Sequence, residues 1–177
     1  MKDIPRILVF DIETAPVLAH VWGLWKQNVG VNQIVSDSYV IAWAAKWLGS
    51  EEVFYADQRD AKDKENDKKI LEKLHALIND ADLTLTHNGK QFDHKRLNSR
   101  FLLHGMKPPS SYRMIDTCEI SRKFFGFTSN KLEFLTNKLN KKYKKLKHEK
   151  FPGFELWKEC LAGNRAAWVE MKKYNIH

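Results

Sequence analysis

The stretch RILVFDIETAP, residues 6–16, joins an apolar run to two acids. RILVF predicts a strand that is buried on both faces. Alternate side chains of a strand share a face, so Asp11 and Glu13 project together if the strand continues through them. Adjacent carboxylates repel each other, and burial increases that repulsion. A divalent cation such as Mg²⁺, which prefers hard oxygen ligands, would compensate; two exposed acids at an ordinary strand end are the alternative.

The composition indicates one globular domain. The chain has 177 residues, of which 43% are hydrophobic, and two cysteines that form no motif. Few cysteines suggest a reducing, intracellular setting, and we expect a bacterial or phage-type protein of the cytoplasm. The start MKDIPRILVF lacks the apolar region of a signal peptide. No apolar run approaches the ~20 residues of a membrane span, so we expect no membrane association.

The charge balance favours an anionic partner. The formal net charge is +8, and the sequence pI is about 9.4. Nucleic acid is the commonest partner of such a protein, although a basic protein without that function is an equal alternative on charge alone.

Hydrophobic periodicity predicts an α/β fold. Strands are expected at residues 6–10, 39–49, 51–58, 82–88 and 111–117, with a hairpin turn at Gly49 and Ser50. Helices are expected at residues 63–81, 91–105, 118–125, 130–140, 154–163 and 164–175. Residues 17–38 are aromatic and irregular and receive no assignment. This order predicts a mixed sheet of about five strands flanked by helices.

A second polar group follows a later strand. THNGKQFD, residues 86–93, places Asn88 at a strand end and Asp93 in the first turn of the next helix. Asn88 could be a simple turn residue before Gly89, and Asp93 a helix-terminal acid favoured by the macrodipole. In α/β sheets, however, functional groups gather at strand ends, where both stretches place their acids.

Together, FDIET and HNGKQFD resemble motifs of the DEDD family of 3′–5′ exonucleases, in the ribonuclease H-like superfamily. In that family a D-x-E motif on the first strand supplies two metal-binding acids, which Asp11 and Glu13 match. The motif N-x-x-x-(F/Y)-D is typical of the proofreading exonuclease domain of family B DNA polymerases. Asn88, Phe92 and Asp93 match it with the spacing intact. The resemblance implies a ribonuclease H-like mixed sheet.

The third family motif, Y-x-x-x-D, brings a fourth acid on a late helix. The chain ends EMKKYNIH, so Tyr174 matches the tyrosine and the acid would fall at position 178, one beyond His177. We therefore expect residues 1–177 to be a single 3′–5′ exonuclease domain truncated just before its last metal-binding acid. A natural or engineered form with a weakened metal site is the alternative.

The resemblance implies a two-metal hydrolysis with Mg²⁺ or Mn²⁺, two ions per site, about 3.5–4 Å apart. Asp11 would bridge the ions, Glu13 would hold one, and Asp93 would serve the other. Tyr174 would orient the attacking water. The product would be a nucleoside 5′-monophosphate from the 3′ end of single-stranded DNA.

The substrate contacts implied by the same resemblance involve Asn88, which would touch the nucleic acid, and Phe92, which would pack beneath the site. A separate candidate is the run NKLNKKYKKLKHEK, residues 137–150, with seven lysines. Lysines can contact phosphates, and a solvated surface is the alternative. The candidates for phosphate contact are Lys141, Lys142, Lys144 and Lys145, with Tyr143 a weaker candidate for base stacking.

Other polar residues are assigned structural roles. Asp116 and Glu119 read as a variant of the capping box for the following helix, with support of the site as the alternative. The histidines share no metal spacing, which argues against zinc. Three further functions stay open: a nucleic-acid-binding module with little cleavage, an RNA-directed exonuclease, and an endonuclease of the same superfamily. N-x-x-x-F-D argues against the endonuclease.

Overall fold

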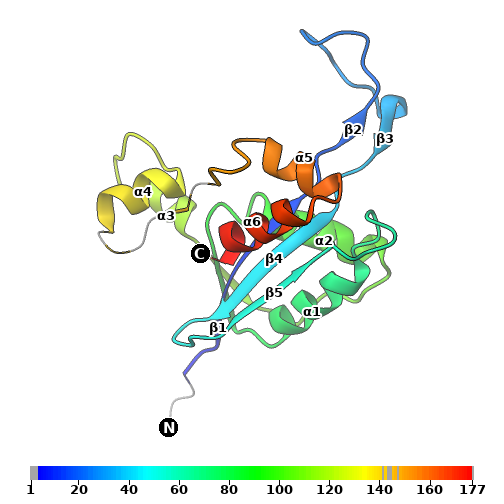
Figure 1. The fold of residues 1–177 in the computed structure, drawn as a ribbon. Coiled ribbons are helices and arrows are strands. Elements are labelled where there is room, and N and C mark those ends of the chain that lie inside the picture. The colour runs from blue at the N-terminus through cyan, green and yellow to red at the C-terminus, as the bar shows by residue number, and fades with distance from the viewer. Residues whose placement is uncertain (1–3, 141, 143–144, 147, 177) are drawn as a thin grey trace.

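A five-stranded mixed sheet forms the centre of the protein, as the sequence predicts (Figure 1). The computed structural model describes residues 4–140, 142, 145–146 and 148–176. The strands run in the order β5-β4-β1-β6-β7. Their bounds are Ile7–Thr14 (β1), Val40–Trp47 (β4), Val53–Asp57 (β5), Leu83–Thr86 (β6) and Arg113–Asp116 (β7).

The first strand continues through its two acids. In β1, Asp11 pairs with Ala44 and Glu13 with Ala42 of antiparallel β4. On its other side β1 is parallel to β6, and β6 is parallel to β7. The carboxyl ends of three parallel strands therefore lie along one edge of the sheet, where functional groups gather in α/β proteins.

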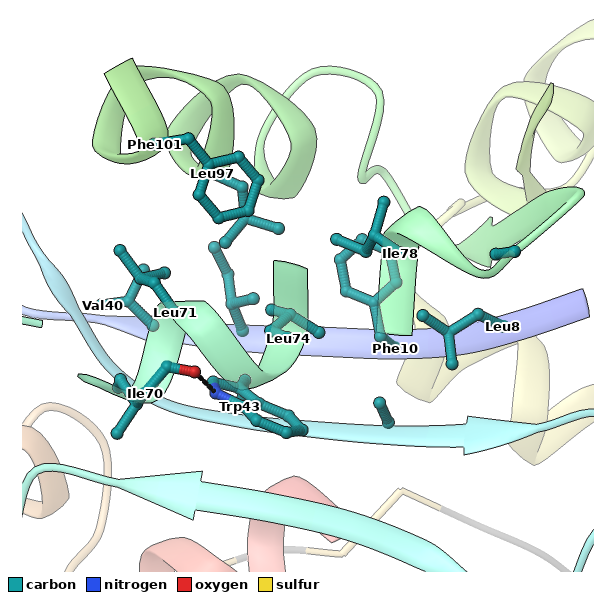
Figure 2. Close-up of a cluster of buried hydrophobic side chains, with 13 residues drawn as sticks. Leu8, Phe10, Val40, Trp43, Ile70, Leu71, Leu74, Ile78, Leu97 and Phe101 are labelled. Atoms are coloured by element: carbon teal, nitrogen blue, oxygen red, sulfur yellow. Dashed lines mark hydrogen bonds between the residues drawn. The ribbon is translucent and has the colours of Figure 1, made fainter. Parts of the chain in front are cut away.

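Two helices cover one face of the sheet and build the larger core. They are α1 (Lys68–Asn79) and α2 (Asp93–Leu103), whose apolar stripes pack on alternate residues of β1 (Figure 2). The indole of Trp43 donates a hydrogen bond to the Ile70 carbonyl at 2.9 Å, which joins β4 to α1. This face of β1 is buried as expected, whereas Val9 on the opposite face is only half-buried.

The opposite face carries the last two helices, α5 (Glu155–Leu161) and α6 (Arg165–Ile176). Leu156, Cys160 and Trp168 pack there with Ile41 and Ala42 of β4. This packing holds the C-terminal part of α6 over the strand that carries the two acids.

The remaining helices are α3 (Thr117–Phe124) and α4 (Leu132–Leu139). Asp116 caps α3 as predicted, by accepting the N–H groups of Cys118 and Glu119. Lys131 directly precedes α4, and its N–H donates to Ser129 Oγ at 3.3 Å.

The helix predicted at residues 63–81 is shorter than expected and begins at Lys68. The side chain of Asp67, fully buried, accepts the Val40 N–H at 2.7 Å and binds the guanidinium of Arg100 at 2.7 Å. Because Asp67 makes these tertiary bonds, α1 begins after it, although the periodic pattern alone predicts a helix that includes Asp67.

Residues 17–38 form an arm that extends from the end of β1 away from the sheet (Figure 1). It contains β2 (Leu18–Ala19), a short 3₁₀ helix η1 (Val31–Gln33) and β3 (Ile34–Ser36), with β2 antiparallel to β3. Trp22 is 99% exposed and Trp25 is 83% exposed. None of the helices described by the structure has the length and apolar character needed to cross a membrane.

Candidate active site

Three acids predicted from separate motifs meet at the carboxyl edge of the sheet. Asp11 and Glu13 come from β1, and Asp93 is the first residue of α2. The Ile12 N–H donates to Asp93 Oδ1 at 3.1 Å, so the third acid is bound to the backbone between the first two. Asp11 is accessible to solvent, whereas Glu13 and Asp93 are buried.

The surroundings of Glu13 favour its protonated form. Burial, followed by the charge of Asp11, raises the Glu13 pKa to about 8. The charge of Lys145 and a hydrogen bond from the Trp157 indole act in the opposite direction. At neutral pH, the Lys145 charge and the Trp157 hydrogen bond are therefore not enough to keep the Glu13 carboxylate fully ionised.

The other two acids show the same tendency. Burial and the charge of Asp11 raise the Asp93 pKa to about 7, although the Ile12 N–H opposes the shift. The protein atoms that surround Asp11 also raise its pKa by displacing water, although its side chain still reaches solvent, and they act against the effects of Lys145 and Asn175. Three acids with raised pKa values at one strand edge are typical of a functional site rather than of a solvated strand end.

The C-terminal part of α6 completes this group. Asn175 Nδ2 donates to Asp11 Oδ2 at 3.2 Å, across almost the whole chain. The sequence predicts Tyr174 but not Asn175. The feature of the sequence that could have pointed to Asn175 is its place directly after Tyr174.

Lys145 lies between Tyr174 and the acids. Its ammonium is 4.9 Å from the centroid of the Tyr174 ring. Burial lowers the Lys145 pKa, but a hydrogen bond to Tyr174 and the charges of Asp11 and Glu13 outweigh this effect and raise it. Lys145 is thus the predicted lysine that the structure brings to the site.

The rest of the lysine run is described only in part. Lys142 is exposed, and Lys141, Tyr143 and Lys144 lie outside the described residues, so their predicted contacts stay predictions.

Aromatic groups hold Tyr174 in place. Its ring meets the rings of His148 and Trp157 edge to face, with centroids 5.0 Å and 5.9 Å away. These partners belong to the segment before α6 and to α5, and neither is a site residue in the sequence prediction. Their side chains fix the ring, as expected for a tyrosine whose hydroxyl must be positioned.

A tight turn positions the second motif. Asn88 has a φ of +68°, and its N–H donates to Asp116 Oδ1 at 2.8 Å, while the Lys90 N–H donates to Asp116 Oδ2 at 3.1 Å. Burial acts to raise the Asp116 pKa, but four backbone N–H donors lower it below its ordinary value. Asp116 therefore has both predicted roles, as helix cap and as support for the site.

Phe92 differs from its expected place. Its side chain is 37% exposed, and the Arg96 guanidinium lies 5.9 Å from its ring centroid. The expectation that Phe92 packs beneath the site is wrong, because its ring is exposed beside Arg96. An exposed ring there is still compatible with the predicted contact to nucleic acid.

Two cavities meet at Lys145 and Tyr174, and one of them is also lined by Asp11. One, of about 960 Å³, is lined among others by Asn88, Arg122 and Tyr174. The other, of about 670 Å³, is lined by Asp11, Asn175 and residues of β4 and its hairpin. Lys145 and Tyr174 border both cavities. A ligand in either would therefore touch the group that surrounds Asp11.

The donor chemistry of the site fits Mg²⁺ or Mn²⁺. Among the described residues, no group of three His, Cys, Asp or Glu side chains already has the arrangement that would hold an ion. The three carboxylates are nevertheless hard oxygen donors, and their raised pKa values show a deficit of positive charge. Asn175 Oδ1 is buried there without a hydrogen-bond partner among the described residues.

A five-stranded mixed sheet with acids at the ends of its parallel strands defines a ribonuclease H-like α/β domain. A sequence model of the RNase_H superfamily matches residues 8–177, and the chain belongs to this superfamily. This confirms the superfamily that the motifs predict. Membership supports a nuclease activity that acts on nucleic acid, and such nucleases generally use divalent metals.

Among solved structures, the chain is similar to the family B DNA polymerase from the hyperthermophilic archaeon Pyrobaculum calidifontis. The two share 17% identity and a TM-score of 0.62, and the match covers 97% of this chain and 22% of the polymerase chain. The likeness concerns the fold, and the chain spans about a fifth of that polymerase. No curated protein matches the chain.

Proposed function

We propose that the protein is a metal-dependent 3′–5′ exonuclease that removes nucleoside 5′-monophosphates from single-stranded DNA. The observation that carries this proposal is the meeting of Asp11, Glu13 and Asp93 at one sheet edge, beside the cavity that Asp11 and Tyr174 line. The 3′ direction is supported by the motifs of Asn88, Phe92 and Tyr174, which match those of 3′–5′ exonucleases. Superfamily membership supports nuclease chemistry as such.

Hydrolysis of a phosphodiester needs an attacking water and stabilisation of charge at the phosphate. Two Mg²⁺ or Mn²⁺ ions, when bound, supply a Lewis acid and a water of lowered pKa. Asp11, Glu13 and Asp93 would hold these ions. Burial raises the pKa of all three acids, and the charge of Asp11 adds to this effect at Glu13 and Asp93. A bound cation would offset this buried negative charge, so the arrangement favours metal binding.

Tyr174 and Lys145 act on the water and the phosphate. Lys145 hydrogen-bonds to Tyr174, while His148 and Trp157 hold the ring. In the proposed mechanism the fixed phenol orients the attacking water. The Lys145 ammonium, whose pKa the site raises further above neutral pH, offsets negative charge that develops on the phosphate.

Asp11→Asn tests the site with a 5′-labelled single-stranded oligonucleotide and Mg²⁺ or Mn²⁺. The unchanged protein is expected to give a ladder of products that shorten one nucleotide at a time, and none with EDTA. Asp11→Asn should slow the ladder by more than about 100-fold, since even indirect metal partners cost about 10- to 100-fold. Asp80→Asn, at an exposed ion pair with Arg6, is the matched control and should leave the rate unchanged.

Other outcomes of this assay would contradict the exonuclease proposal and indicate a different function. Internal cuts would indicate an endonuclease, and binding without cleavage would indicate a nucleic-acid-binding module. A parallel assay with the RNA oligonucleotide of the same sequence decides between DNA and RNA, and faster RNA cleavage would make the protein an RNA-directed exonuclease. A ladder that Asp11→Asn leaves unchanged would contradict the assignment of the acids.

A further inference from the structure

Two phenylalanines at the end of α3 have no place in the core. Phe124 is 66% exposed and Phe125 is 56% exposed. They adjoin each other in the sequence RKFFGF, residues 122–127, and neither takes part in the acid site. Neighbouring exposed rings present a large apolar surface to solvent, which is typical of a binding surface.

The rings lie among basic groups. Arg122 and Lys123 precede them directly, and the Lys123 ammonium is 5.3 Å from the Phe124 ring centroid. Phe125 stacks on Phe127 with centroids 5.5 Å apart and planes inclined by 27°. Aromatic faces interleaved with cations are what proteins use to bind single-stranded nucleic acid without sequence preference.

The loop that carries these rings is anchored to the site. Ser121 Oγ donates to Asn130 Oδ1 at 2.6 Å, which closes the loop between α3 and α4. The Asn130 carbonyl is 3.0 Å from His87 Nε2, directly before Asn88. The rings therefore belong to a loop bound to the same strand end that positions the second motif.

The length of α3 suits a short stretch of single-stranded nucleic acid. α3 begins next to Asp116 at the sheet edge, and its eight residues span about 12 Å. Roughly three to four stacked nucleotides, at about 3.4 Å each, cover that length. Arg122 lines the larger cavity together with Asn88 and Tyr174, so the surface is continuous from the site to the base of the rings.

We propose that Arg122, Lys123, Phe124 and Phe125 form an aromatic platform on which single-stranded nucleic acid stacks, a few nucleotides 5′ of the scissile bond. This inference rests on the proposed function, because it assigns the platform to the substrate of the same site. The flanking cations select an anionic partner, which favours nucleic acid over an apolar protein surface. The platform explains how a substrate longer than the cavity is held.

The platform predicts a dependence on substrate length. Phe124→Ala/Phe125→Ala should weaken binding of a labelled octanucleotide, measured by fluorescence anisotropy without divalent cations, by roughly 5- to 100-fold. Hydrolysis of a dinucleotide with Mn²⁺ should stay unchanged, because a dinucleotide does not reach the rings. Leu102→Ala/Leu103→Ala, which removes another exposed apolar pair, is the matched control and should alter neither measurement.

Two further variants separate stacking from apolar contact. Phe124→Trp/Phe125→Trp should retain octanucleotide affinity, whereas Phe124→Leu/Phe125→Leu should lose it as the alanine variant does. Wild-type affinity in the alanine variant, or full affinity in the leucine variant, would overturn the platform. A slower dinucleotide hydrolysis in the alanine variant would also overturn it, as damage to the site.

The test also distinguishes the two proposals. If the unchanged protein binds the octanucleotide through the rings but cleaves nothing, the exonuclease proposal fails and the platform stands. If it cleaves both substrates and the alanine variant does so equally well, the platform alone fails.

Discussion

Gly89 is the residue on which the second motif depends most closely. A Cβ at this position would lie 2.3 Å from Thr86 Oγ1 and 2.5 Å from Thr86 Cβ. Thr86 is itself buried at the end of β6. The turn that places Asn88 and leads into Asp93 can therefore pass over β6 only where no side chain intervenes.

Gly89→Ala is accordingly expected to lower the free energy of unfolding by about 1–3 kcal/mol, because the contact forces a backbone shift. It should also reduce nuclease activity, since the shift moves Asp93. Urea unfolding and the oligonucleotide assay measure the two effects. Gly126→Ala is the matched control for stability, because a Cβ there meets nothing within 4 Å, and it should leave the free energy of unfolding unchanged. Equal stability of the two variants would contradict this account of the turn.

At this scale the sequence predicts residues that belong to short local motifs. Asp11, Glu13 and Asp93 can be found because strand alternation and strand-end position leave a local pattern. Asn175 cannot, because its contact with Asp11 spans 164 residues and depends on how α6 packs. Phe92 shows the converse, since its motif is intact but its ring is exposed rather than packed beneath the site.

Among the elements, the arm at residues 17–38 and helix α6 differ most in burial. Each contains tryptophan, but Trp22 is exposed on the arm while Trp168 is fully buried between α6 and β4. The burial of a large ring in a packed interior, and not its presence in the chain, sets its contribution to stability.

Trp168→Ala is therefore expected to lower the free energy of unfolding by about 3–5 kcal/mol, or to prevent folding. Trp22→Ala should change it by less than about 0.5 kcal/mol, because its side chain is already in solvent. Urea unfolding followed by circular dichroism compares the two. A large loss of stability in Trp22→Ala would mean that the arm packs against the domain.

The same contrast explains which elements the sequence predicts. Helices α1, α2 and α6 bury one face, so their apolar residues recur with the helical period, while β4 is buried on both faces and leaves a continuous apolar run. The arm buries little, and its aromatic residues follow no period, so β2 and β3 leave no readable pattern. The first residues of the predicted helix 63–81 fail for another reason, since the tertiary bonds of Asp67 override local propensity.

At the scale of the whole molecule, the acids of the site lower the free energy of unfolding by an amount that depends on pH. The Glu13 pKa is about 8 in the folded protein, against an ordinary value of 4.5, and the Asp93 pKa is about 7. Between about pH 4.5 and about pH 8, Glu13 therefore binds more protons in the folded state than in the unfolded state. Stability contributed by the protonated acids is thus present at low pH and decreases as pH rises toward about 8.

Glu13→Gln, which mimics the protonated acid, should therefore gain stability relative to the unchanged protein as pH rises. In EDTA we expect the difference in unfolding free energy to grow by at least about 1 kcal/mol between about pH 5 and pH 8. Mg²⁺ should reduce it by stabilising the ionised site. Glu51→Gln, at a fully exposed acid, is the control and should show no such trend. A difference that shrinks with pH would contradict the raised pKa of Glu13.

The position of β1 at the centre of the sheet also determines when the site can form during folding. β1 must pair with β4 on one side and, in parallel, with β6 on the other, and α6 must then reach Asp11 from the far end of the chain. Contacts between such distant segments form slowly, because they close long loops. Asp11 and Glu13 lie on the first strand of the sheet, yet their arrangement with α6 is among the last features of the fold to be completed. Catalytic competence would thus arise in the same late step that completes the domain.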